Sequence, residues 1–499
     1  MLHKLKRLFA DTAIYGISTI LGRFLNFLLV PFYTHVLLPG EYGIVAYVYS
    51  FIAFINVLYA YGMESAYFKY SSTLEVGTAR DNFTTPFLSL LVTSALFSGI
   101  ILLFTPGLAH LAGLPPNSSV VVTYTAWILF FDTIALVPFA SLRMEGKAKR
   151  FAILKFTNIT INVGANLVLL LIFRAGVEGI FLSGLIASAA TAVMLLPTVV
   201  RHFTPHFSKH LYRELLRFGL PYIPAGLAAM MIQVVDRPIL KLLTNDDTVG
   251  IYQANYRLGI FMMLMVSMFD YAWRPFFLTN ASAPGAKQLF SRVLTYFVLA
   301  MAAVFLVLSF FLPDLIQMRI FGKHLIAPDY WGGMAIIPVV LLAYVFLGIY
   351  NNLMAGIYIE KKTNYLPAIT MAGALTNVVA NFALIPAMGM MGAAIATFLS
   401  YAFMAIILYV VVQRVYPVKY EWGRIGKIAA AAVVVYLLSL ARPMASPSLL
   451  WQSALLVLFG LLMYWMKFFV PAELAWAKKL MIRPGKVPVG PEERENPDL

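Results

Sequence analysis

The sequence predicts an all-α polytopic membrane protein, and three observations support this fold class. The hydrophobic fraction is 61%, while charged residues make up only 12% of the 499 residues, which is too few for the surface of a soluble chain of this length. Apolar runs of about 20 residues, the length that an α-helix needs to cross ~30 Å of hydrocarbon, recur along the whole chain. The order of these runs is also repeated within the sequence.

Counting the apolar runs that are bounded by polar or Pro/Gly turns predicts about fourteen transmembrane helices. They are expected near residues 12–35, 41–63, 84–106, 120–142, 152–173, 178–200, 214–240, 248–273, 289–312, 331–357, 364–386, 391–412, 426–441 and 449–469.

The distribution of basic residues predicts the orientation. If the N-terminus lies inside, most of the 37 lysines and arginines fall on inner turns or tails. Because basic residues near span ends resist translocation, both termini are expected in the cytoplasm. The turns expected outside include 37–40, 107–118, 174–177, 241–247 and 442–448. The net charge of +15 then reflects topology and contact with membrane lipids, and does not indicate a nucleic-acid partner.

The two halves of the chain repeat one pattern. Gly43-Ile44-Val45 opens the second apolar run, and Gly250-Ile251-Tyr252 opens the eighth run, 207 residues later (43 to 250). Asparagines four residues apart occur at 162 and 166 and again at 377 and 381, and we interpret both pairs as packing residues. Two six-helix lobes in the same orientation imply a pseudo-twofold axis along the membrane normal and a central cavity.

This repeat predicts the domain organisation. The expected parts are an N-terminal six-helix lobe at 1–205, a C-terminal six-helix lobe at 206–415, two extra C-terminal helices at 416–470 and a cytoplasmic tail at 471–499.

Ionisable residues within or at the ends of the spans are the candidate site residues. A charge at the centre of a lone span costs about 2.5–3.5 kcal/mol, so it usually faces a cavity or a partner. The candidates for substrate binding are the basic residues Arg23, Lys155, Arg237 and Arg257, and those for coupling or gating are the acidic residues Glu64, Asp132, Asp236 and Asp270.

A structural interpretation stays open for each candidate. Arg23 lines the cavity or forms an ion pair with Asp132. Asp236 and Arg237 are neighbours, so on a helix they are expected to point about 100° apart and not simply to neutralise each other. Glu64 and Asp270 can equally be solvated helix ends. The many aromatic residues are interpreted mainly as membrane-interface belts.

No pattern indicates catalysis or a cofactor. The sequence has no cysteine, no phosphate-binding glycine-rich loop and no His-Glu-x-x-His motif. Its seven histidines fall at termini, turns or span ends, where a solvated side chain is the default. The chain is therefore expected to be no enzyme and to hold neither a metal nor a cofactor.

Three stretches of the chain resemble a known family. They are Gly40-Glu41-Tyr42-Gly43 through Glu64 and Lys69, the stretch from Arg217 to Arg257, and Asn377-x3-Asn381 through Pro386, Gly389 and Gly392-Ala393-Ala394. Over roughly residues 10–415, the pattern resembles the polysaccharide-exporter (Wzx-type O-antigen flippase) branch of the superfamily that also holds multidrug extruders and the lipid II flippase.

This resemblance implies a V-shaped cavity that opens alternately to each side of the bacterial inner membrane. The implied substrate is an oligosaccharide linked to undecaprenyl diphosphate, and the candidate protein partners are a polysaccharide polymerase and a chain-length regulator. Because arginine binds phosphate bidentately and stays charged, we expect Arg23 and Arg257 to bridge the diphosphate, with Lys155 assisting and Asp132 as the resting partner of Arg23.

Two other functions remain as alternatives. A cation-coupled multidrug extruder of the same superfamily would be expected to have acidic cavity walls, whereas a diphosphate needs basic ones. A membrane-embedded polysaccharide polymerase or ligase would be expected to need a substantial outer loop. The longest outer connection, near 313–330, is under twenty residues long, which makes this function the less favoured one.

Overall fold

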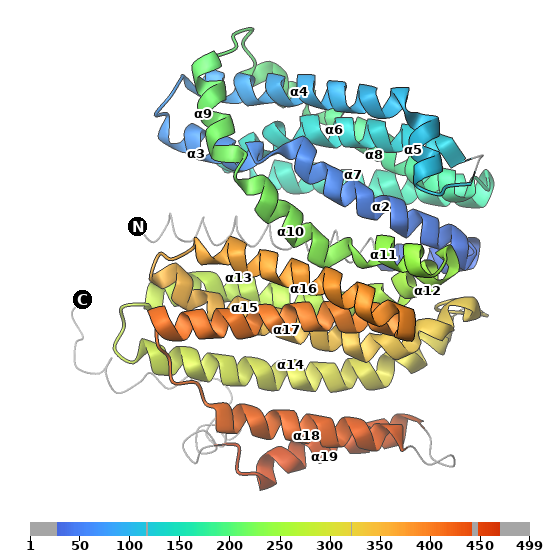
Figure 1. The fold of residues 1–499 in the computed structure, drawn as a ribbon, viewed down its shortest axis with the longest axis vertical. Coiled ribbons are helices and arrows are strands. Elements are labelled where there is room, and N and C mark those ends of the chain that lie inside the picture. The colour runs from blue at the N-terminus through green and yellow to red at the C-terminus, as the bar shows by residue number, and fades with distance from the viewer. Residues whose placement is uncertain (1–26, 116–117, 321, 442–447, 470–499) are drawn as a thin grey trace. The chain divides into compact units, whose positions relative to one another are not determined.

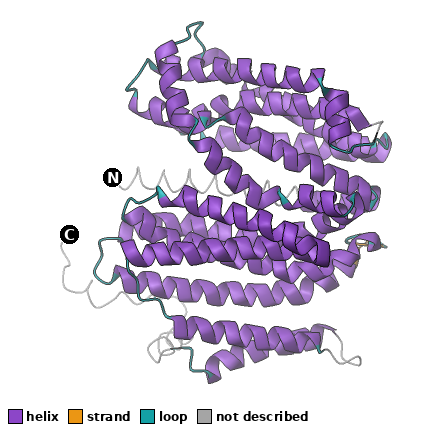
Figure 2. Cartoon of the chain, viewed as in Figure 1, coloured by secondary structure: helices purple, strands orange, loops and turns teal. Residues whose placement is uncertain are grey.

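The computed structural model describes residues 27–115, 118–320, 322–441 and 448–469, and within them the chain is almost entirely helical (Figures 1 and 2). An apolar helix over Phe27–Val36 comes first. The helices that follow it up to residue 202 are α2 (Pro39–Ala60), α3 (Met63–Thr73), α4 (Ala79–Leu103), α5 (Thr105–Leu111), α6 (Ser119–Met144), α7 (Ala148–Leu167) with the π-helical turn η2 (Val168–Ile172), and α8 (Gly176–His202).

The second half continues in the same manner. Its elements are α9 (Lys209–Gly219), α10 (Tyr222–Val234), α11 (Asp236–Leu243), α12 (Asp246–Tyr256), the 3-10 turn η3 (Arg257–Gly259), α13 (Ile260–Asn280), α14 (Ala286–Gln317), the two-residue strands β1 (Arg319–Ile320) and β2 (Lys323–His324), η4 (Pro328–Ile336), α15 (Ile337–Ile359), α16 (Tyr365–Met388), α17 (Met390–Val415), α18 (Trp422–Leu440) and α19 (Ser448–Trp465). The two strands form one antiparallel hairpin.

The predicted class, an all-α polytopic membrane protein, is confirmed. Within the described residues, ten helices are long and apolar enough to cross a membrane, or eleven if the bent pair α9–α10 is one span. Three of the fourteen expected spans do not qualify. The first reaches into residues 12–26, which lie outside the described residues. The eighth, which contains η3, is not among the helices that meet the length and hydropathy criteria, although α13 alone has 21 residues, and the fourteenth is a shorter helix over Leu449–Trp465.

The seventh expected span is bent where the sequence places its prolines. Helices α9 and α10 meet at an angle of 42°, with Pro221 between them. Proline lacks the amide hydrogen that would continue the helical hydrogen bonds, so it allows the chain to change direction. A second break at Val235 separates α10 from α11.

The repeated asparagine pairs have the same local structure in both halves. The side-chain amide of Asn166 donates to the carbonyl oxygen of Asn162 at 2.9 Å, and that of Asn381 donates to Asn377 at 2.8 Å. Three of the four asparagines, all except Asn162, are fully buried. Both hydrogen bonds lie within one helix, and the burial of the three side chains agrees with a packing role.

The described chain falls into two compact units. The first comprises the described residues up to Ala286 together with Leu312–Val418, and the second comprises Lys287–Phe311 with the described residues from Lys419 onward. The second unit therefore joins the middle of α14 to α18 and α19. The expected boundary between two six-helix lobes, near residue 205, falls inside the first unit and stays a prediction.

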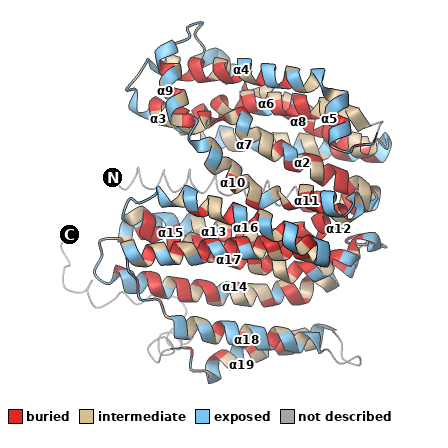
Figure 3. Cartoon of the chain, in the orientation of Figure 1, coloured by how far each residue is buried: buried red, intermediate tan, exposed pale blue. Residues whose placement is uncertain are grey.

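Burial differs strongly between helices of the first unit (Figure 3). In the most apolar 18 residues of the span formed by η4 and α15, and in those of α17, 50% of the residues are buried. In the span formed by α7 and η2 the share is 17%. α7 is therefore not a core helix. Its side chains are available to lipid and to the cavity described next.

Candidate functional site

A cavity of about 1120 Å³ lies within the first unit. Its walls come from α2, α6, α7, α8, α10 and the helix Phe27–Val36, and Arg257 enters it from η3. Ligand cavities for small molecules usually measure about 300–1,000 Å³, so this one has room for a bulky polar headgroup.

Three charged side chains line the cavity among the described residues. Asp132 comes from α6, Lys155 from α7 and Arg257 from η3, so the lining carries two positive charges and one negative charge. Charges in a membrane-spanning region are costly unless they face water or a partner. Their position on a cavity explains why the apolar helices tolerate them.

Arg257 occupies the point where the eighth span is interrupted. α12 ends at Tyr256 and α13 begins at Ile260, with the 3-10 turn between them. The guanidinium interacts electrostatically with the hydroxyls of Tyr33, Tyr42 and Tyr49. It forms no hydrogen bond or ion pair with any other described residue. Its five N–H donors therefore remain available to a ligand.

Asp132 and Lys155 form a second polar feature of the cavity. Both residues are exposed and they attract each other electrostatically, but they form no direct ion pair. The Lys155 ammonium lies 4.3 Å from the ring centre of Phe139, and Ser188 of α8 lines the same cavity.

The expectation for Asp236 and Arg237 is wrong in one respect, because the two neighbours do neutralise each other. The Arg237 guanidinium lies 2.6 Å from the Asp236 carboxylate. It also donates to Gln253 at 3.1 Å and lies 4.3 Å from the ring centre of Tyr256. The second oxygen of Asp236 accepts from Tyr252 at 2.5 Å. The Arg237 guanidinium also donates to the carbonyl oxygen of Gln233 in α10 at 2.5 Å. The long side chain therefore reaches back toward Asp236, and the angle between neighbouring Cβ atoms does not decide the contact.

Arg237 and Asp236 are consequently part of a buried polar core. Their side chains are only 7% and 1% exposed, and neither lines the cavity. The structure thus brings Lys155 and Arg257 to the cavity, but not the third described basic candidate, Arg237. The fourth, Arg23, lies outside the described residues, as does its expected ion pair with Asp132.

The two acidic candidates at span ends form ion pairs at the surface. Glu64 pairs with Arg143 at 2.8 Å, and Asp270 pairs with Arg274 at 3.0 Å one helical turn away. Neither lines the cavity.

Glu145, just beyond α6, forms ion pairs with Lys147 and His202. Burial raises the pKa of the Glu145 carboxyl, but Lys147 and His202 outweigh burial and bring this pKa below its usual value.

Sequence reasoning missed the tyrosines of the cavity. Tyr42, Tyr49 and Asn56 on α2 all line it, and their spacing of seven residues places them on one helical face. The interpretation of aromatic residues as interface belts concealed this stripe. The signal was present, because the three polar groups recur every two helical turns within an apolar run.

Contacts at both ends of α2 join the two halves of the chain. The start of α2 lies beside α12 (Figure 1), and there Gly43 packs against Gly250. The hydroxyl of Tyr330 in η4 donates to the carbonyl oxygen of Leu37 at 2.9 Å. Just beyond its other end, Gly62 packs against the backbone of Gly219 in α9. The described halves therefore meet at both ends of this cavity wall.

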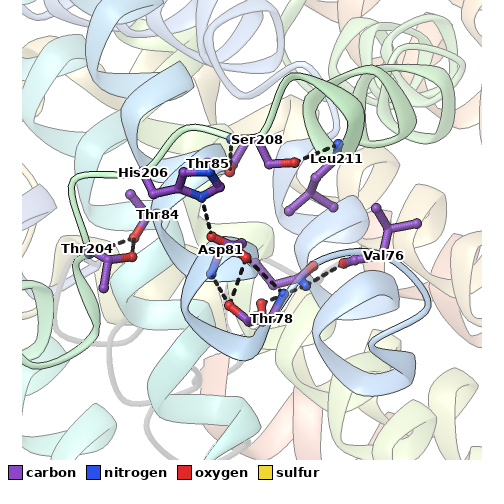
Figure 4. A network of polar contacts seen from close by, with 10 residues as sticks. Val76, Thr78, Asp81, Thr84, Thr85, Thr204, His206, Ser208 and Leu211 are labelled. Atoms are coloured by element: carbon purple, nitrogen blue, oxygen red, sulfur yellow. Dashed lines mark hydrogen bonds and ion pairs between the residues drawn. The ribbon is translucent and has the colours of Figure 1, made fainter.

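The segment between α8 and α9 is held on the start of α4 (Figure 4). Asp81 caps α4 by accepting from the Thr78 amide at 3.0 Å, and its other oxygen lies 2.7 Å from His206. The Thr204 amide donates to Thr84 at 3.0 Å. The connection between the predicted lobes is thus fixed to the first half, away from the cavity.

Comparisons with known proteins agree with this architecture. Residues 34–270 match the family of polysaccharide biosynthesis proteins. The lipid II flippase MurJ in an inward closed conformation has a similar fold, with a TM-score of 0.69 and 16% identity over 95% of this chain and 100% of that one. No curated protein matches the chain in sequence.

Multidrug transporters are similar in fold as well. A MATE family transporter of the MOP superfamily matches with a TM-score of 0.62 in its inward-facing conformation, at 14% identity over 82% of this chain and 96% of that one. In an outward-facing conformation the TM-score is 0.57, again at 14% identity, over 84% and 96%. The protein is thus a polytopic helical membrane protein with the fold of this superfamily. The resemblance predicted from the sequence is confirmed at that level, while the Wzx-type branch stays a prediction.

Proposed function

We propose that this protein is a flippase that moves an undecaprenyl-diphosphate-linked oligosaccharide across the bacterial inner membrane by alternating access. In this proposal both termini lie in the cytoplasm, and the cavity of about 1120 Å³ receives the headgroup. The match of residues 34–270 to polysaccharide biosynthesis proteins supports a glycan-related substrate.

The observation that carries the proposal is Arg257. A diphosphate that leaves the headgroup region loses its hydration, and this loss is prohibitive unless cations replace the water. An arginine whose donors have no other described partner meets this need, since its planar fork binds phosphate oxygens bidentately. Arg23 remains the predicted second contact.

The rival function, multidrug extrusion, is compatible with the fold but not favoured by the charge of the cavity. A cationic drug needs acidic walls, whereas the described lining holds two basic residues and one acidic residue. In the proposal Asp132 serves the transport cycle and does not bind a cationic substrate.

The deciding experiment measures flipping of a labelled undecaprenyl-diphosphate-linked hexose in proteoliposomes. Arg257→Ala is expected to reduce flipping to background. Arg257→Lys is expected to retain part of the activity, because lysine keeps the positive charge but lacks the planar guanidinium that binds phosphate bidentately. Arg274→Ala is the control, because this arginine pairs with Asp270 outside the cavity. Flipping by Arg257→Ala at the wild-type rate would refute the proposal, and ethidium efflux by the wild type would support the rival.

A further inference from the structure

The polar wall of the cavity is distinct from Arg257. It consists of Asp132 on α6, Lys155 and Asn158 on α7, and Ser188 on α8, all in the first half of the chain and all lining the cavity. Arg257 comes from the second half. A role for this wall is not explained by diphosphate binding, because its one positive and one negative charge give no net attraction for an anion.

The members of the polar wall are positioned for a ligand that has both donors and acceptors. Asp132 and Lys155 are exposed and near each other, yet they are not in direct contact. Both amide hydrogens of Asn158 are used on α8, at 3.0 Å to the carbonyl oxygen of Ala187 and 2.7 Å to the hydroxyl of Thr191. This leaves the Asn158 side-chain oxygen as a fixed acceptor.

Vicinal hydroxyls of a sugar ring match this arrangement. One hydroxyl can donate to a carboxylate while its oxygen, or that of its neighbour, accepts from an ammonium. A free metal cation fits less well, since the Lys155 ammonium already supplies a positive charge beside Asp132. An apolar chain fits worse still, because it would leave these polar groups unpaired.

The polar wall and Arg257 line the same cavity, and Tyr49 of α2 lines it with them. One headgroup in this cavity can therefore face both features. In a lipid-linked oligosaccharide, the first sugar is bonded directly to the diphosphate. A diphosphate on Arg257 would therefore present that sugar to the neighbouring wall.

We infer that Asp132, Lys155, Asn158 and Ser188 form a sugar subsite that selects glycan-bearing lipids over the bare lipid diphosphate. This inference rests on the proposed function, and it gives Lys155 and Asp132 a role in specificity. The subsite contributes affinity only when a sugar is attached, whereas Arg257 contributes with either lipid.

The test compares two lipids on the purified full-length protein in detergent. The probes are undecaprenyl diphosphate carrying a single hexose and undecaprenyl diphosphate without a sugar, and the measurement is Kd by native mass spectrometry. The wild type is expected to bind the hexose lipid about tenfold more tightly, because a hydrogen bond to a charged group is worth roughly one decade in affinity.

Asp132→Asn and Lys155→Met are expected to remove this preference by weakening only the hexose lipid. Arg257→Gln should weaken both lipids in parallel. Lys147→Met is the matched control, since Lys147 pairs with Glu145 outside the cavity, and it should change neither Kd. The double variant Asp132→Asn/Lys155→Met removes both charges together, so it excludes misfolding caused by a single unpaired charge, and its melting temperature is recorded alongside.

The outcomes separate the two proposals. Equal binding of both lipids by the wild type, or parallel loss of both in the Asp132 and Lys155 variants, would overturn the sugar subsite and leave the flippase proposal standing. Failure of the folded wild type to bind either lipid would overturn both.

Discussion

Gly43 of α2 and Gly250 of α12 face each other so closely that neither position has room for a methyl group. A Cβ at Gly43 would lie 1.9 Å from the carbonyl oxygen of Asp246, and one at Gly250 would lie 1.8 Å from that of Pro39. The two glycines also occupy equivalent places in the sequence repeat. Repeat-related backbones thus meet directly, as expected for residues beside a pseudo-twofold axis.

This contact predicts how the start of α2, on the predicted outer side, responds to a small substitution. Gly43→Ala should destabilise the contact by about 1–3 kcal/mol through overpacking, which corresponds to a shift of roughly 5- to 150-fold toward the state open at this end. The chain has no cysteine, so labelling of an introduced Asn56→Cys in the cavity by a membrane-impermeant maleimide reports the opening. The labelling rate from the predicted outer side should rise in the Gly43→Ala background.

Gly99→Ala is the matched control for that measurement. Gly99 lies on α4, and a Cβ there would meet nothing within 4 Å. This variant should label at the original rate. If Gly43→Ala and Gly99→Ala behave alike, the glycine contact does not control access to the cavity.

The same end of the molecule offers a reversible lock. A Cβ at Gly40 would lie 4.0 Å from the Cβ of Asp246, which is within the range of about 3.5–4.5 Å that a disulfide requires. The variant Gly40→Cys/Asp246→Cys should therefore crosslink under mild oxidation and stop flipping, and reduction should restore it. Each single cysteine variant serves as a control. Unchanged flipping by a fully crosslinked protein would exclude separation of α2 from α12 during transport.

The N-cap of α4 allows a prediction about stability. Asp81→Ala removes both the reciprocal cap with Thr78 and the contact with His206, so it should cost about 0.5–2 kcal/mol. His206→Ala removes only the contact to the connecting segment and should cost less. Melting temperatures of the two purified variants in detergent check this order. A larger loss in His206→Ala would mean that docking of the segment, and not the cap, dominates.

The sequence allowed much of the fold to be predicted, because membrane helices depend on length and hydropathy alone. The repeat was visible because Gly43 and Gly250 are needed where backbones touch, and the asparagine pairs where helices pack. The break of the eighth span at Arg257 was not predicted, although Gly259, a residue with low helix propensity, lies within the 3-10 turn. The division of the chain into two compact units could not be predicted either. It depends on contacts between residues that are distant in sequence, which group the middle of α14 with α18 and α19.

The structure places three of the predicted charged residues on the cavity, and it shows that others form pairs away from the cavity. Lys155, Asp132 and Arg257 were found because an isolated charge in an apolar run needs an explanation. The role of Arg237 was misjudged because its partners Gln253 and Tyr256 lie on another helix. The tyrosine stripe on α2 was overlooked because aromatic residues have two common uses in membrane proteins, in interface belts and in ligand sites.

The difference between the two arginines gives the last prediction. Arg237 is buried against Asp236, Gln253 and Tyr256, while Arg257 faces the cavity without such partners. Arg237→Ala should therefore destabilise the protein by about 3–5 kcal/mol, because it leaves the Asp236 carboxylate as an uncompensated buried charge.

Arg257→Ala should leave stability nearly unchanged and abolish flipping. Thermal unfolding of both purified variants in detergent, beside flipping in proteoliposomes, checks this contrast. The double variant Asp236→Asn/Arg237→Ala should regain part of the lost stability, since the unpaired charge is gone. An equal loss of stability in Arg237→Ala and Arg257→Ala would show that Arg257 also has a structural partner, and it would remove the argument that this guanidinium is kept free for the diphosphate.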